Sequence, residues 1–156
     1  SMKVRAEELG MSQLEIITLA SIIEGEAIYD DERATISAVY HNRLEKGMRL
    51  QADPTIQYII EGGPRRLLNE DLKIESEYNT YLNSGLPPGP INNPGKESII
   101  AALYPAVNDY IYFVARGDGY HTFSKTKKEH NRAKRRFQEV RRRVRQEKKN
   151  TKAEGL

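Results

Sequence analysis

The sequence predicts an α+β fold that is mostly helical, with a small antiparallel sheet and a long basic C-terminal helix. Three observations predict this class: apolar residues recur at helical spacing early in the chain, two short apolar segments flank a glycine turn, and the C-terminal segment is strongly basic. The chain has 156 residues, a length that fits one domain. We expect one domain over residues 1–156, with a core over about residues 12–132 and a helical tail over about residues 126–149.

The first predicted helix covers about residues 13–27. Ser12 and Glu15 have the spacing of a capping box, in which each side chain accepts a hydrogen bond from a backbone N–H of the first turn. An apolar stripe at helical spacing follows, formed by Ile16, Ala20, Ile23 and Ala27. This helix is therefore expected to bury one face in the core.

Two further helices follow from local signals. One is expected to begin after Asp30-Asp31 and to end at Gly47, a residue type common just past helix C-termini. Another is expected from Asp53 to Ile60, with the Asp53 side chain as its cap and Pro54 in its first turn.

The middle of the chain is predicted to be an ordered loop. Residues 78–94 are rich in Pro, Gly and Asn, which do not continue a helix. Asn93-Pro94 repeats the signal of a cap followed by proline, so we expect another helix there, closed by Pro105.

A β-hairpin and a long helix are expected at the C-terminal end. Residues 110–115 form the best strand pattern, residues 117–119 form a Gly-Asp-Gly turn, and residues 120–123 are the expected returning strand. From residue 126 to about residue 149 the sequence predicts one basic helix.

The charges are distributed unevenly. Residues 1–124 carry 11 Lys and Arg against 18 Asp and Glu, whereas residues 125–152 carry 14 against 3. The chain has no cysteine, which excludes disulfides and thiolate metal sites, and no His, Asp or Glu spacing favours a metal. No apolar run is long enough to cross a membrane. We therefore expect no metal and no cofactor.

Glu24 and Glu26 are the candidate chemical groups of the first helix. At 100° per residue they lie about 160° apart, one on each shoulder of the apolar stripe, so they cannot act as a touching pair. Apolar neighbours disfavour a charged carboxylate, and a protonated carboxyl group is what glycosidic cleavage requires of its general acid. The alternative is that both are solvated or form ion pairs with Arg33 and Arg43.

Longer motifs support the first interpretation. In order, they are Leu19–Ala27, Asn42–Leu44, Met48–Thr55, Tyr78–Tyr81, Gly85–Gly89, Asn93–Gly95, Tyr112–Val114 and His121–Phe123. Each is weak alone, but the ordered series resembles the endolytic murein transglycosylase family, also known as MltG or YceG-like. The resemblance covers about residues 15–132.

The resemblance implies a fold, a reaction and a place of action. It implies a lytic transglycosylase that cleaves the MurNAc–GlcNAc bond within nascent peptidoglycan strands and leaves 1,6-anhydro-MurNAc ends. It implies peptidoglycan glycan strands as the partner, together with proteins of the cell-wall synthesis complex. Family members carry an N-terminal membrane anchor and a LysM-like subdomain, which this sequence lacks. The expected location is the bacterial cell membrane, with the catalytic domain on the extracytoplasmic side and membrane contact through regions outside this sequence.

The resemblance also suggests roles for residues. Aligned on the family's Glu-x-Glu motif, the catalytic glutamate falls on Glu26, with Glu24 as the alternative. Glu26 is expected to protonate the glycosidic oxygen and then to accept the proton of the attacking C6 hydroxyl. Arg43 is a candidate partner of a glutamate or of a substrate carboxylate, or else forms an ordinary surface ion pair.

Six further side chains are candidates for binding sugar. Their hydroxyl, amide, carboxylate and aromatic groups suit a glycan groove, and they are Gln51, Asp53, Thr55, Tyr78, Asn79 and Tyr81. For Asp53, helix capping alone would explain the residue. For the tyrosines, the alternative is that they hold a long loop in place.

Three other functions compete with this prediction. A non-catalytic peptidoglycan-binding module would use the same groove, and a lysozyme-like hydrolase would use water in place of the C6 hydroxyl. A nucleic-acid-binding domain would depend on residues 125–152, but the acidic remainder of the chain disfavours it. We therefore expect no nucleic-acid partner.

Overall fold

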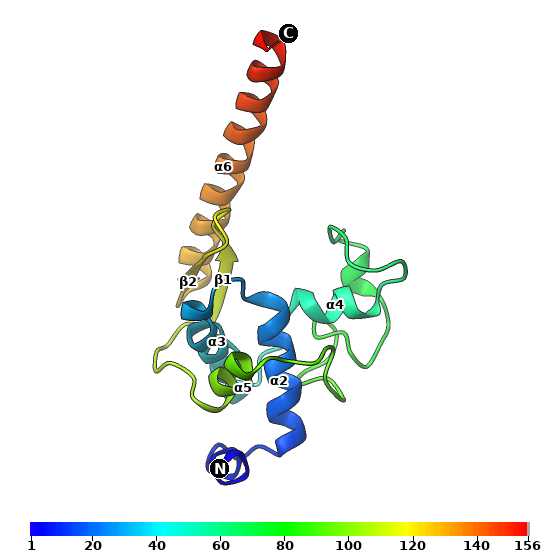
Figure 1. Cartoon of the computed structure of the whole chain (residues 1–156), viewed down its shortest axis with the longest axis vertical. Coiled ribbons are helices and arrows are strands. Elements are labelled where there is room, and N and C mark those ends of the chain that lie inside the picture. The colour runs from blue at the N-terminus through cyan, green and yellow to red at the C-terminus, as the bar shows by residue number, and fades with distance from the viewer. Residues whose placement is uncertain (156) are drawn as a thin grey trace. The chain divides into compact units, whose positions relative to one another are not determined.

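The computed structural model describes residues 1–155 and divides the chain into two compact units, Ser1–Asp109 (unit 1) and Tyr110–Leu156 (unit 2). Unit 1 is helical, and unit 2 contains a hairpin and one long helix (Figure 1). The predicted α+β class, with mostly helical content and a small antiparallel sheet, is confirmed.

Unit 1 contains five α-helices and two 3-10 turns within the described residues. The elements are α1 (Met2–Glu8), α2 (Gln13–Glu26), η1 (Asp30–Glu32), α3 (Arg33–Glu45), α4 (Asp53–Ile59), η2 (Asp71–Lys73) and α5 (Lys96–Leu103). The predicted helices at residues 13–27, after residue 31 and from residue 53 are confirmed to within a residue or two. Helix α1 was not expected, because its mixed sequence shows no apolar stripe.

Helix α2 runs through the middle of unit 1, with α3 and α5 packed against it (Figure 1). The predicted capping box is present: the Glu15 N–H donates to Ser12 Oγ at 3.1 Å, and the Ser12 N–H donates to Glu15 Oε1 at 2.9 Å. Ile16, Leu19 and Ile23 are fully buried, and so is Ser21 between them. Helix α2 is thus buried on nearly all sides, and only its ends reach the surface.

Two predicted helix caps are wrong. Asp53 does not cap α4: the cap position is Ala52, and Asp53 is the first helical residue, with its side chain used elsewhere. Asn93-Pro94 does not open α5, which begins at Lys96 after the cap residue Gly95. The Gly95 N–H donates to the Glu24 carboxylate instead, so a distant side chain replaces the local cap.

Unit 2 consists of β1 (Tyr112–Ala115), β2 (His121–Ser124) and α6 (Lys127–Glu154). The strands pair antiparallel with Phe113 opposite Phe123. Gly117 and Gly119 both have positive φ, which the tight turn between the strands requires. The predicted hairpin and basic helix are confirmed, and α6 extends about one turn beyond residue 149.

No helix within residues 1–155 has both the length and the apolar character needed to cross a membrane.

Candidate active site

Glu24 and Glu26 leave the C-terminal turn of α2 in different directions. Glu24 accepts a hydrogen bond from the Gly95 N–H at 2.6 Å and forms an ion pair with Arg33 at 3.1 Å. Arg33 Nη1 also donates to Ser98 Oγ at 2.7 Å. Glu24 therefore connects α2 to the start of α5 and to α3, as the ion-pair alternative predicted for this residue.

Glu26 lies on the other side of α2, close to two tyrosines. Its negative charge acts on both Tyr40 of α3 and Tyr81 of the loop after η2. This arrangement agrees with the sequence prediction that the two glutamates lie on different sides of α2, since Glu24 contacts Gly95 and Arg33. Glu26 is half-buried.

Asp53 and Arg43 complete a group of charged and phenolic side chains around Glu26. Burial raises the pKa of the Tyr40 phenol well above its usual range, and the charges of Glu26 and Asp53 raise it further. The Arg43 guanidinium acts on Tyr40 in the opposite direction. We refer to Glu26, Tyr40, Arg43, Asp53 and Tyr81 as the tyrosine–carboxylate cluster.

Tyr81 is held by a strong hydrogen bond within this cluster. Its hydroxyl donates to Asp53 Oδ1 at 2.5 Å. Burial raises the pKa of Tyr81 above its usual range, and the charge and hydrogen bond of Asp53 add to this. The negative charge of Glu26 raises this pKa too, while Arg43 lowers it. Both phenols thus keep their protons across the neutral pH range and can act as hydrogen-bond donors.

Arg43 is a buried cation, with 7% of its surface exposed. Its Nη1 donates to the backbone carbonyl of Arg49 at 2.7 Å, which joins α3 to the segment before α4. A buried guanidinium needs compensating negative charge nearby. Glu26 and Asp53 carry negative charge in the same cluster, since both act on the two tyrosines on which Arg43 also acts.

Thr55 and Asn79 are fully buried next to residues of the cluster, and their side chains hold the backbone there. Thr55 Oγ1 donates to Ala52 O at 2.7 Å and lies 2.9 Å from Thr80 Oγ1. Asn79 Nδ2 donates to the carbonyls of Leu72 and Ile74 at 3.0 and 2.8 Å. The Asn79 side-chain oxygen accepts from the N–H of Tyr81 at 2.8 Å and so orients the backbone of that tyrosine.

Gln51 and Tyr78 remain accessible. Gln51 is exposed and has a φ of +49°, a left-handed conformation that is uncommon outside glycine. Its N–H donates to Thr80 O at 3.2 Å, so backbone pairing holds this unusual turn directly before Asp53. Tyr78 is half-buried and packs on Tyr58 of α4 at a centroid distance of 4.9 Å.

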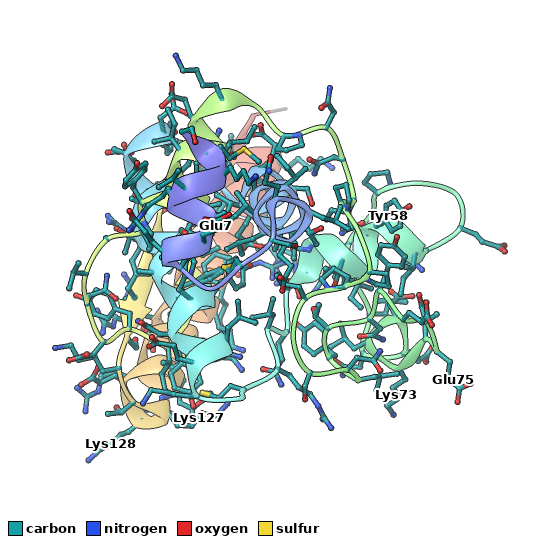
Figure 2. The ribbon with its side chains drawn as sticks, turned by 90° about the horizontal axis from the view of Figure 1, so that it is seen from below. Glu7, Tyr58, Lys73, Glu75, Lys127 and Lys128 are labelled. Carbon is teal, nitrogen blue, oxygen red and sulfur yellow. The ribbon has the colours of Figure 1, made fainter. Side chains whose placement is uncertain are left out.

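A shallow pocket of about 300 Å³ adjoins the Glu24-Gly25-Glu26 turn. Its lining is mostly apolar and consists of Gly25, Pro54, Gln57, Tyr58, Pro64, Ile91 and Asn92. Tyr58, labelled in Figure 2, is half exposed on α4 and presents an aromatic wall to this pocket. The Gln57 side chain is engaged at both ends by the backbone of Arg65, which fixes one rim.

The structure therefore groups some of the predicted residues and separates others. Glu26, Arg43, Asp53 and Tyr81 lie together, Glu24 lies apart, and Thr55 and Asn79 lie inside the fold. Tyr40 was not among the predicted site residues, although its i, i+3 spacing from Arg43 places both on one helix face. Tyr58 was not predicted, because an isolated tyrosine carries no motif. The predicted catalytic and sugar-binding roles stay predictions at this point.

No group of three or more His, Asp and Glu side chains in residues 1–155 has an arrangement suited to a metal ion.

Comparisons with known proteins show which family this chain is related to. The chain matches the model of the YceG-like family over residues 1–136. It is 49% identical over 122 residues to an endolytic murein transglycosylase of Bacillus subtilis (strain 168), covering 78% of this chain and 34% of that protein. It is 37% identical over 107 residues to an endolytic murein transglycosylase of Streptococcus pneumoniae serotype 2 (strain D39), covering 65% of this chain and 19% of that protein.

A solved structure agrees with the sequence matches. The fold superposes on the crystal structure of a YceG-like protein from Listeria monocytogenes with a TM-score of 0.76 at 46% identity, covering 83% of this chain and 41% of that one. The chain spans about a third of the length of the Bacillus subtilis relative. Since the family model matches most of the sequence and the fold agrees, the chain belongs to the YceG-like family.

Proposed function

We propose that this chain is the catalytic portion of an endolytic peptidoglycan lytic transglycosylase, with Glu26 as its general acid and base. The observation that carries the proposal is the tyrosine–carboxylate cluster, in which a half-buried carboxyl group lies between two protonated phenols, a second carboxylate and a buried guanidinium. Relatives named endolytic murein transglycosylases support the substrate class.

The proposed reaction needs one carboxyl group in two protonation states. Glu26 first donates its proton to the oxygen that joins MurNAc C1 to the next GlcNAc, and the C1–O bond breaks. The Glu26 carboxylate then accepts the proton of the MurNAc C6 hydroxyl as that oxygen bonds to C1. The products are a 1,6-anhydro-MurNAc end and a free GlcNAc hydroxyl, and Glu26 regains its proton.

The surroundings of Glu26 suit the acid form that begins this cycle. Glu26 is the last residue of α2, where the helix dipole is negative and a further negative charge is disfavoured. Asp53 contributes a second negative charge to the same cluster, while Arg43 provides the opposing positive charge for the step in which Glu26 is a carboxylate.

The remaining candidates are proposed to bind the glycan. The pocket beside Gly25 offers the Tyr58 ring and apolar walls to the apolar face of a sugar, and Gln51 offers an exposed amide to its substituents. Tyr78 supports Tyr58 by ring packing. Thr55 and Asn79 act by holding this wall of the groove, since their side chains are buried and hydrogen-bonded.

Location and partners follow from the substrate. Peptidoglycan strands lie outside the cytoplasm, so we propose that this portion works on the extracytoplasmic side of the bacterial cell membrane. Cell-wall synthesis proteins that produce nascent strands are the proposed partners, because an enzyme acting within nascent strands must meet them where they are made.

The test is mass spectrometry of uncrosslinked peptidoglycan strands digested with the wild type, Glu26→Gln and Glu24→Gln. We expect anhydro-ended products from the wild type, none from Glu26→Gln, and reduced but detectable product from Glu24→Gln. Circular dichroism and thermal unfolding of all three proteins control for folding, since Glu24 joins α2 to α5.

Each other outcome points to a different function. Reducing ends would indicate a hydrolase that uses water. Equal cleavage by wild type and Glu26→Gln, with loss in Glu24→Gln, would transfer the acid role to Glu24. Glycan binding without product, also after the N-terminal regions of the longer relatives are fused to this chain, would indicate a binding module.

A further inference from the structure

Helix α6 has two unlike halves. At 100° per residue, with Phe137 at zero, one half between about 20° and 160° contains ten of the positions from 134 to 153. Eight of these are Lys or Arg and none is acidic, the other two being Gln138 and Ala153. The eight are Lys134, Arg135, Arg141, Arg142, Arg145, Lys148, Lys149 and Lys152. We call this half the cationic face.

The other half of α6 differs in composition and in contacts. It contains the acidic residues Glu139, Glu147 and Glu154 and the apolar side chains Phe137, Val140 and Val144. The hairpin packs on this half. Ala133 is buried, and a Cβ added at Gly117 would lie 3.4 Å from the Phe137 ring, so the ring packs against this turn. The fold of unit 2 therefore uses the apolar half and leaves the cationic face outward.

The eight cations are all exposed and are not neutralised within the described chain. None of them forms an ion pair with an acidic residue among residues 1–155. Salt bridges along a solvated helix need acids three or four residues away. Only Arg135 and Arg142 have such a neighbour in Glu139, with which neither forms an ion pair, and the other six cations have none. The segregation of charge is therefore a feature of α6 that its own folding does not require.

We propose that the cationic face of α6 binds the surface of an anionic lipid bilayer, with the helix lying along that surface. From residue 134 to residue 152 the face extends about 27 Å at 1.5 Å per residue. Its cations spread over more than a third of the helix circumference, so they form a field two or three side chains wide. Such a field matches a two-dimensional array of phosphates, whereas a single extended polyanion would contact one row.

The proposed contact is electrostatic. Val140 and Val144, each 44% exposed, lie at 300° and 340° on the other half of α6 and take no part in it. Each Lys or Arg close to an anionic bilayer surface contributes about 1 kcal/mol to binding. The cationic face also contains no aromatic residue that could stack on nucleic-acid bases.

Most of the cationic face lies outside the part of the chain that matches the family model. The family match ends at residue 136, and six of the eight cations lie beyond it. The inference does not depend on the glycan-cleaving activity, because no residue of the tyrosine–carboxylate cluster takes part in it.

The test is co-sedimentation of the full chain with vesicles, comparing equal amounts of phosphatidylglycerol and phosphatidylcholine with phosphatidylcholine alone. Two triple variants each remove three positive charges from α6. The first is Arg141→Gln, Arg145→Gln and Lys148→Gln on the cationic face. The second is Arg132→Gln, Arg136→Gln and Arg143→Gln on the other half. Glutamine keeps helix propensity close to that of arginine and lysine.

We expect binding to the anionic vesicles alone, weakened roughly a hundredfold by the first triple and less than about tenfold by the second. Salt should weaken binding steeply. Equal losses in the two triples, with helix content unchanged by circular dichroism, would overturn the proposal, because net charge and not a face would then govern binding. Absence of binding to anionic vesicles, or binding to polyphosphate in preference to them, would overturn it as well.

Discussion

At the scale of single residues, neighbours along the chain have unlike tasks because a helix separates them in space. Glu24 and Glu26 are two positions apart, yet Glu24 binds the start of α5, and Glu26 lies near the buried phenol of Tyr40 and the half-buried phenol of Tyr81. The Glu24 carboxylate is engaged by the Gly95 N–H and by the Arg33 guanidinium, which join it to two neighbouring elements. This leaves Glu26 as the better candidate for carrying a proton.

Tyr81→Phe tests whether the phenol–carboxylate contact matters for activity. The change removes the hydroxyl that donates to Asp53 and keeps the ring. We expect strand cleavage to fall about tenfold or more, because the Asp53 side chain beside Glu26 loses the hydroxyl that orients it. Tyr104→Phe, an exposed tyrosine outside the cluster, is the matched control. An unchanged rate in Tyr81→Phe would remove this contact from the mechanism.

Asp71 provides a prediction about pH. Hydrogen bonds from the Arg65 side chain and the Leu68 N–H lower the pKa of the Asp71 carboxyl from 3.8 to about 2. Since the folded pKa is lowered, the stabilisation is fully present above about pH 4 and is lost as pH falls towards 2. In Arg65→Gln, NMR titration of Asp71 should show the pKa moving back towards 3.8. An Asp71 pKa near 3.8 in the wild type would contradict the assigned ion pair.

At the scale of elements, local patterns sufficed where a signal and its partner lie within a few residues. The capping box of Ser12 and Glu15, the glycine turn of the hairpin and the proline in the first turn of α4 all act over three or four positions. Such features are decided by chain geometry and were predicted correctly.

Long-range contacts explain what the sequence did not predict. The start of α5 is bound by Glu24, 71 residues earlier, and Asn93-Pro94 therefore predicted the wrong first residue for this helix. The Asp53 side chain turns to Tyr81, 28 residues later, instead of capping α4. Tyr40 joins the site only because α3 packs beside α2. No local pattern contains these pairings, since tertiary packing creates them.

Gly25→Ala tests the contact between α2 and α4. A Cβ at residue 25 would lie 2.7 Å from Pro54 Cβ, closer than two carbons can approach. We expect a loss of about 1–3 kcal/mol in the free energy of unfolding, measured by urea denaturation, because α4 must move. Gly89→Ala, where the added Cβ would meet Tyr78 Oη at 3.5 Å, is the control and should change stability little. Equal stability of the two variants would mean that α4 moves aside without cost.

At the scale of the whole molecule, the two units carry charges of opposite sign. Unit 1 has 10 Lys and Arg against 17 Asp and Glu, and unit 2 has 15 against 5. The net charge of +3 therefore describes neither unit. The family match covers all of unit 1 and the first part of unit 2. That residues 1–156 act as one catalytic domain stays a prediction.

The end of α6 is expected to contribute little to the stability of the molecule. Residues 141–155 are all exposed. Removing residues 145–156 therefore takes away helical turns that contact solvent, and no buried side chain of the described residues loses a packing partner. Calorimetry should show a Tm within about 2 °C of the full chain, while the helical circular dichroism signal falls. The comparison is removal of residues 125–156, which takes Ala133 and Phe137 off the hairpin.

This longer truncation should unfold the hairpin, because a two-stranded ribbon without a packing partner is marginal in water. Loss of the cross-strand amide signals of residues 112–115 in NMR spectra would report that unfolding. A drop of more than about 5 °C in the shorter truncation would instead show that the last turns of α6 support the fold. If the shorter truncation keeps its Tm, the fold does not need the segregated charges at the end of α6, as the proposed bilayer-binding surface requires.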